Sequence, residues 1–103
     1  MEGMELISFQ IISAVGTARS LYIEAIQEAK KGNFERAEEL IKEGSEIFLQ
    51  GHHAHTQLIQ QEANGQVVVP TLMLMHAEDQ LMSADGFKII AEEIIEVYKN
   101  TKK

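Results

Sequence analysis

The sequence predicts an all-α protein, an antiparallel up-down-up bundle of three long helices. Apolar residues recur every three or four positions over three long segments, which is the spacing of one helix face. Only short stretches with Gly32, Gly65 and Pro70 separate these segments, and short links make neighbouring helices antiparallel. We expect one domain over residues 1–103 with helices at about 4–31, 34–64 and 70–99, each about 45 Å long.

The first helix has an apolar stripe that continues for seven turns. Gly16 interrupts it at a cost of about 1 kcal/mol relative to alanine, so we interpret Gly16 as a point of close approach to another helix. Lys30 and Lys31 suit the C-terminal end of the helix dipole, Gly32 suits a left-handed turn, and Asn33 is expected to cap the second helix. The stripe comprises Ile7, Ile11, Ala14, Val15, Ala18, Leu21, Tyr22, Ala25 and Ala29.

The second and third helices differ in how much apolar surface they carry. The second has one seam at a spacing close to 3.5 residues: Ala37, Ile41, Gly44, Phe48, Gly51, His55 and Leu58. The third, opened by Pro70 and Thr71, has apolar residues on more than one face: Leu72, Met73, Leu74, Met75, Ile89, Ile90, Ile94, Ile95 and Val97. One inward stripe does not need so many apolar residues. We therefore expect a second buried face, and so a homo-oligomer.

Composition excludes several classes of function. The formal net charge of −7 disfavours nucleic-acid binding, which needs a cationic surface. The absence of cysteine excludes disulfides, thiolate metal sites and cysteine nucleophiles. No apolar run is expected to approach a membrane span, and residues 1–5 lack the basic region of a signal peptide. We expect a cytoplasmic protein.

One histidine stands within the methionine-rich run 72–82. His76 shares a helix face with Asp79 at i+3 and Gln80 at i+4, and neutral imidazole is a nucleophile and a metal ligand near physiological pH. From the residues alone, a lone histidine on an apolar helix is more commonly a hydrogen-bonded core residue. Both interpretations stay open at this point.

The other histidines form a cluster in the second helix. His52 and His55 share a face and have the spacing of a metal-chelating pair, but such pairs usually need further ligands. The more ordinary interpretation is a polar strip that includes His53, or a hydrogen-bonded residue of the seam.

Several motifs resemble one family: the IIA component of the lactose/cellobiose class of the bacterial phosphoenolpyruvate-dependent sugar phosphotransferase system (PTS). Residues 76–82, H-A-E-D-Q-L-M, resemble the family's H-A-Q-D-H-L-M. Residues 16–20, G-T-A-R-S, resemble its G-x-A-R-S, and the segments 32–34 and 56–65 resemble its first turn and the end of its second helix. The matches occur in order along nearly the whole chain.

The resemblance implies a fold, a reaction and a set of partners. The fold would be a homotrimer of three-helix chains. His76 would accept a phosphoryl group from phospho-HPr and pass it to the cysteine of a IIB partner, which phosphorylates a sugar entering through the membrane IIC component. Asp79 would help to hold one divalent cation, typically Mg²⁺, where three chains meet. Met75, with its neighbours, would offer an adaptable apolar docking surface.

Two residues beside the expected site depart from the family pattern. Glu78 replaces the family's glutamine and adds negative charge near the phosphoryl position, and Gln80 replaces its second histidine. Gly86 is expected to loosen the third helix. If Glu78 and Gln80 disable the site, the alternative is a helical interaction module without transfer. A metal-binding bundle using His52, His55 and His76 is a third hypothesis.

Overall fold

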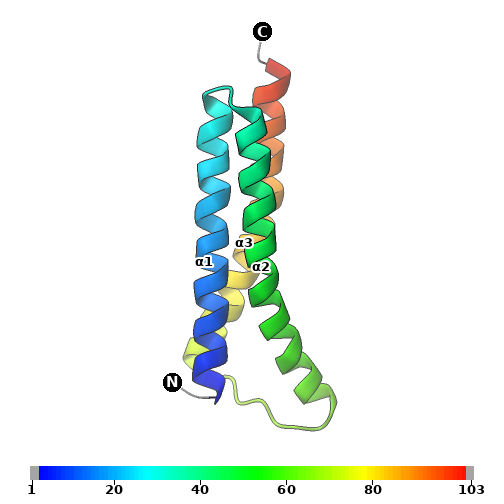
Figure 1. The fold of residues 1–103 in the computed structure, drawn as a ribbon. Helices are drawn as coiled ribbons and strands as arrows, with labels where there is room; N and C mark the ends of the chain where they lie inside the picture. The colour runs from blue at the N-terminus through cyan, green and yellow to red at the C-terminus, as the bar shows by residue number, and fades with distance from the viewer. Residues whose placement is uncertain (1–2, 102–103) are drawn as a thin grey trace.

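A computed structural model describes residues 3–101, which form three helices and no strand. Helix α1 spans Gly3–Lys30, α2 spans Phe34–Ala63 and α3 spans Leu72–Thr101. The bundle measures 56 × 24 × 19 Å, and α1 packs along both other helices, which contact each other much less (Figure 1). The predicted three-helix fold is confirmed. Residues 1–2 and 102–103 of the expected domain lie outside the described residues.

The turn between α1 and α2 is closed by backbone hydrogen bonds. Gly32 has a φ of 87°, and the Asn33 amide donates to the Glu28 carbonyl at 2.9 Å, as in helix ends closed by a left-handed glycine. Asn33 stands at the N-cap position, but the expected side-chain cap is absent. Its amide Nδ2 donates instead to the Glu28 carboxylate at 3.1 Å. Hydrogen bonds from Asn33 and Lys31 lower the pKa of Glu28.

The connector between α2 and α3 crosses the end of the bundle at which α2 diverges from α1 (Figure 1). Gly65, with a φ of 86°, follows α2, and residues 66–71 have no regular structure. Helix α3 begins at Leu72, two residues later than expected. The Thr71 hydroxyl accepts a hydrogen bond from the Leu74 amide at 3.1 Å, which makes Thr71 the N-cap.

The core is built largely from small residues. Gly44 and Gly51 of α2 lie very close to α1. A Cβ added at Gly44 would lie 2.6 Å from Tyr22 Cε1, and one added at Gly51 would lie 3.1 Å from Val15 Cγ1. Gly16 has no such neighbour within 4 Å, so the close approach expected there is wrong. Gly86, which was expected to loosen the third helix, lies inside α3, which continues through it. The buried alanines that let the helices approach are Ala14, Ala18, Ala25, Ala29, Ala37, Ala54, Ala77, Ala84 and Ala91.

Helix α1 is more apolar than expected. By length and composition alone it could cross a membrane, with a mean hydropathy of 1.3 over its most apolar window, contrary to the expectation that no run approaches a span. A core helix passes the same test, and Ile11, Val15, Ala18 and Tyr22 of α1 are at most 2% exposed within the bundle. Packing in the core therefore accounts for this face of α1, while 33% of the apolar window as a whole is buried.

Candidate functional site

The imidazole of His76 lies at the surface. His76 is exposed, whereas its neighbours on α3, Leu74 and Ala77, face the core at 6% and 0% exposure. The interpretation of His76 as a buried core residue is therefore wrong. The core needs only one face of α3, and the helical rotation carries His76 away from that face.

Between Leu72 and Ile89, α3 exposes several large apolar side chains along one face. Leu72, Met75, Met82 and Ile89 are 82%, 56%, 67% and 60% exposed, and they are spaced by three, seven and seven residues. Asp79, also exposed, fills the gap between Met75 and Met82. We call the set Leu72, Met75, Asp79, Met82, Gly86 and Ile89 the α3 stripe. Its alternation of three and four residues is the pattern of a coiled-coil seam, and Asp79 is its one ionisable member.

Gln80, one turn after His76, is held by a residue of another helix. Arg19 of α1 donates from Nη1 to Gln80 Oε1 at 2.8 Å, and both side chains are half-buried. A guanidinium has donors only, so the amide of Gln80 must present its oxygen to Arg19. Its NH₂ group is then left for another acceptor.

Glu78 is turned toward α2. Its carboxylate Oε2 lies 2.5 Å from His55 Nδ1, and each side chain is 27% exposed. His55 Nδ1 is buried and has no hydrogen-bond partner among the described residues. Its contact with the Glu78 carboxylate is an ion pair only when the imidazole is protonated. Residues two apart on a helix do not share a face. The negative charge of Glu78 is therefore directed away from the face that carries His76.

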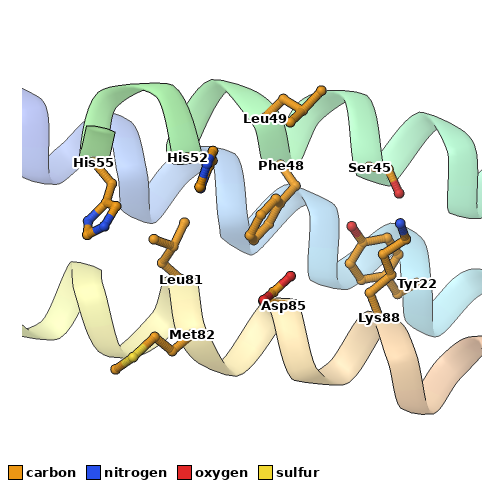
Figure 2. Close-up of a pocket in the computed structure, with 10 residues that line it drawn as sticks. All are labelled: Tyr22, Ser45, Phe48, Leu49, His52, His55, Leu81, Met82, Asp85 and Lys88. Carbon is orange, nitrogen blue, oxygen red and sulfur yellow. The ribbon is translucent and has the colours of Figure 1, made fainter. Parts of the chain in front are cut away.

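A groove of about 550 Å³ separates α2 from α3 just beyond this contact. Figure 2 shows His52, Phe48 and Ser45 on α2 facing Leu81, Asp85 and Lys88 on α3. His76 is not among the residues that line this groove. The His52 and His55 rings lie 6.3 Å apart, yet within residues 3–101 no group of three or more metal-ligating side chains comes together.

The structure adds two residues to the neighbourhood of the expected site, Arg19 and His55. Sequence reasoning quoted Arg19 only as part of a motif. It placed His55 in the seam of the second helix or in a metal site with His52 and His76, and did not pair it with Glu78. A signal existed for Arg19, because a cation inside an apolar helical run needs a partner. The partner itself depends on how α1 and α3 are aligned, which the sequence does not state.

Several known proteins resemble this chain in both sequence and structure. Residues 6–99 match the family model of the PTS system, Lactose/Cellobiose specific IIA subunit. A Bacillus subtilis (strain 168) protein, the lichenan-specific phosphotransferase enzyme IIA component, is 45% identical over 95% of this chain and 89% of its own. The cellobiose-specific enzyme IIA of Bacillus anthracis superposes with a TM-score of 0.93 at 41% identity, covering 97% of this chain and 92% of the other.

A third similar structure is the IIA(chitobiose) component of the Escherichia coli phosphotransferase system, solved in complex with HPr. It has a TM-score of 0.85 at 30% identity, with both chains fully covered. Together with the match over residues 6–99, these likenesses show that the chain belongs to the lactose/cellobiose-specific IIA family of the PTS. It is a phosphotransferase component of a sugar-transport system.

Proposed function

We propose that His76 accepts a phosphoryl group from phospho-HPr and passes it to the cysteine of a IIB partner, during uptake of a lactose-, cellobiose- or β-glucoside-type sugar. The observation that carries the proposal is the exposed His76 imidazole amid exposed methionine and leucine side chains. The similar IIA(chitobiose) component was solved in complex with HPr, which supports HPr as the donor. The IIB partner would then phosphorylate the sugar as it enters through the membrane IIC component, and the IIA protein itself would act in the cytoplasm.

The chemistry suits a single exposed imidazole. One neutral ring nitrogen attacks phosphorus, and a new N–P bond forms as the bond to the donor breaks. Such a transfer asks the protein mainly for in-line positioning and charge stabilisation. The exposed ring can be approached along the surface, and Met75, which precedes it, has a flexible side chain that can adapt to two differently shaped partners.

The α3 stripe supports self-association, and the family resemblance makes the assembly a homotrimer. A single chain leaves this seam uncovered, with side chains such as Leu72 and Met82 more than half exposed, and water-exposed apolar stripes of this spacing are typical of helices that pair with copies of themselves. Asp79 would then recur once per chain around a shared axis. Repulsion between carboxylates in a poorly solvated interior is strong.

The residues fit a shared cation better than a cation held by one chain. No group of three or more metal-ligating side chains forms within residues 3–101, so one chain does not supply a complete site. Asp79 offers a hard carboxylate oxygen of the kind that Mg²⁺ prefers, and it stands in the stripe where copies would meet. When bound, the cation would neutralise the Asp79 carboxylates and link the chains. Asp79 therefore acts in assembly, one turn from His76.

The test is phosphorylation with phosphoenolpyruvate, enzyme I and HPr, followed by intact mass measurement. The proposal predicts an acid-labile adduct of about 80 Da, one phosphoryl group, that His76→Gln abolishes. The matched control is His53→Gln, because His53 is also exposed but lies on α2; His55→Gln is likewise expected to retain the label.

Label that survives in His76→Gln would move the acceptor to another residue. A wild-type protein that binds HPr but never acquires the adduct would instead favour the interaction module without transfer.

A further inference from the structure

The side chains within one turn of His76 on α3 offer few groups to stabilise a phosphoryl dianion. Positions three and four residues away are helical neighbours. On the N-terminal side these are Leu72 and Met73, which are apolar, and on the C-terminal side they are Asp79 and Gln80. An ionised carboxylate only accepts hydrogen bonds. Gln80 is thus the one hydrogen-bond donor among these four side chains.

An amide is a useful donor only if its NH₂ group faces the acceptor. A free glutamine side chain on a helix surface can rotate by half a turn and present its oxygen instead, which would repel the phosphoryl oxygens. The 2.8 Å hydrogen bond from Arg19 Nη1 to Gln80 Oε1 excludes that orientation. Arg19 belongs to α1, where the neighbouring Ala18 is fully buried, so the backbone from which the guanidinium extends is fixed in the bundle.

We infer that Arg19 fixes the Gln80 amide with its NH₂ group available to a phosphoryl group on His76, so that Gln80 supplies the donor of the site and Arg19 acts as its positioning residue. This inference rests on the proposed function. It also explains how the site accommodates Glu78: the carboxylate lies against His55 on α2, while the donor Gln80 and the Arg19 cation stand on the α1 side.

The competing explanation is that the Arg19–Gln80 hydrogen bond only ties α1 to α3. Gln80→Glu separates the two explanations. A glutamate has the same shape and forms an ion pair with Arg19, so the tie is kept or strengthened. The NH₂ donor, however, is replaced by a second acceptor oxygen.

The experiment measures the rate of phosphoryl transfer from phospho-HPr and the thermal midpoint for wild type, Gln80→Glu and Gln80→His. We expect Gln80→Glu to keep the midpoint and to slow transfer at least about tenfold, given the usual effect of removing one oxyanion donor. Gln80→His should retain transfer, since an imidazole N–H can donate. Arg19→Met should cause a smaller loss that Arg19→Lys restores, and it should cause no further loss in the Gln80→Glu background.

A second measurement requires no substitution in the site. In wild-type protein the side-chain NH₂ resonances of Gln80, assigned by their absence from Gln80→Glu, should shift when His76 is phosphorylated. Unshifted resonances, or wild-type transfer by Gln80→Glu, would overturn this inference while leaving the proposed function intact. Failure of the wild-type protein to become phosphorylated at all would overturn both.

Discussion

Gly44→Ala tests how closely α1 and α2 pack. A Cβ at residue 44 would lie 2.6 Å from Tyr22 Cε1, 3.0 Å from Tyr22 Cδ1 and 3.2 Å from the Ala18 carbonyl oxygen. Tyr22 is only 1% exposed, so its ring has little room to move, and the carbonyl belongs to the backbone. Overpacking of this kind costs about 1–3 kcal/mol, against a gain in helix propensity of about 1 kcal/mol.

Gly16→Ala is the matched control. It has the same gain in propensity, and its Cβ meets nothing within 4 Å, so we expect stabilisation by about 1 kcal/mol. The difference between the two variants isolates the packing term at about 1–3 kcal/mol. The assay is urea unfolding followed by circular dichroism, at one protein concentration because assembly contributes to stability. Equal stability of the two variants would show that α2 does not approach α1 at Gly44.

Three further predictions concern docking, assembly and the core. Met75→Glu should slow transfer both from phospho-HPr and to IIB without changing the circular dichroism spectrum or the sedimentation of the protein, because it places a charge in the apolar surface beside His76. Unchanged rates in rapid-quench assays would place docking elsewhere, and slow transfer accompanied by dissociation would place Met75 in the seam between chains. In sedimentation experiments, chelation should dissociate the proposed trimer of the wild-type protein at low protein concentration. Asp79→Leu should stay assembled, since an apolar replacement of buried charge is often neutral or stabilising; a wild-type protein that is monomeric throughout would contradict this. Burial raises the pKa of Tyr22 above its ordinary value of 10.0. The buried, protonated phenol of Tyr22 therefore contributes its full stabilisation below that pH, and this stabilisation is lost as the pH rises through the folded-state pKa. Thermal midpoints of wild type should therefore fall more than those of Tyr22→Phe above pH 10.0, and parallel curves would contradict the role of Tyr22.

The three helices and their turns are encoded locally, and this is why the sequence alone determines them. The periodic stripe of α1, with Ile11, Val15 and Ala18, involves only residues within a few turns of each other. Gly32 and Gly65 adopt the positive φ values that end a helix wherever the helix packs. The choice of His76 as the candidate acceptor likewise came from a short motif and stays a prediction, although the family to which that motif pointed is confirmed over residues 6–99.

Only the tertiary structure decided which residues meet between helices. Gly16 and Gly44 look alike in the sequence, yet only Gly44 faces another helix closely. The sequence placed Glu78 and Gln80 beside His76 but could not pair them with His55 on α2 and Arg19 on α1. Such contacts depend on the rotation and alignment of each helix, which are set by how the whole alanine-rich core packs. No local pattern contains that information.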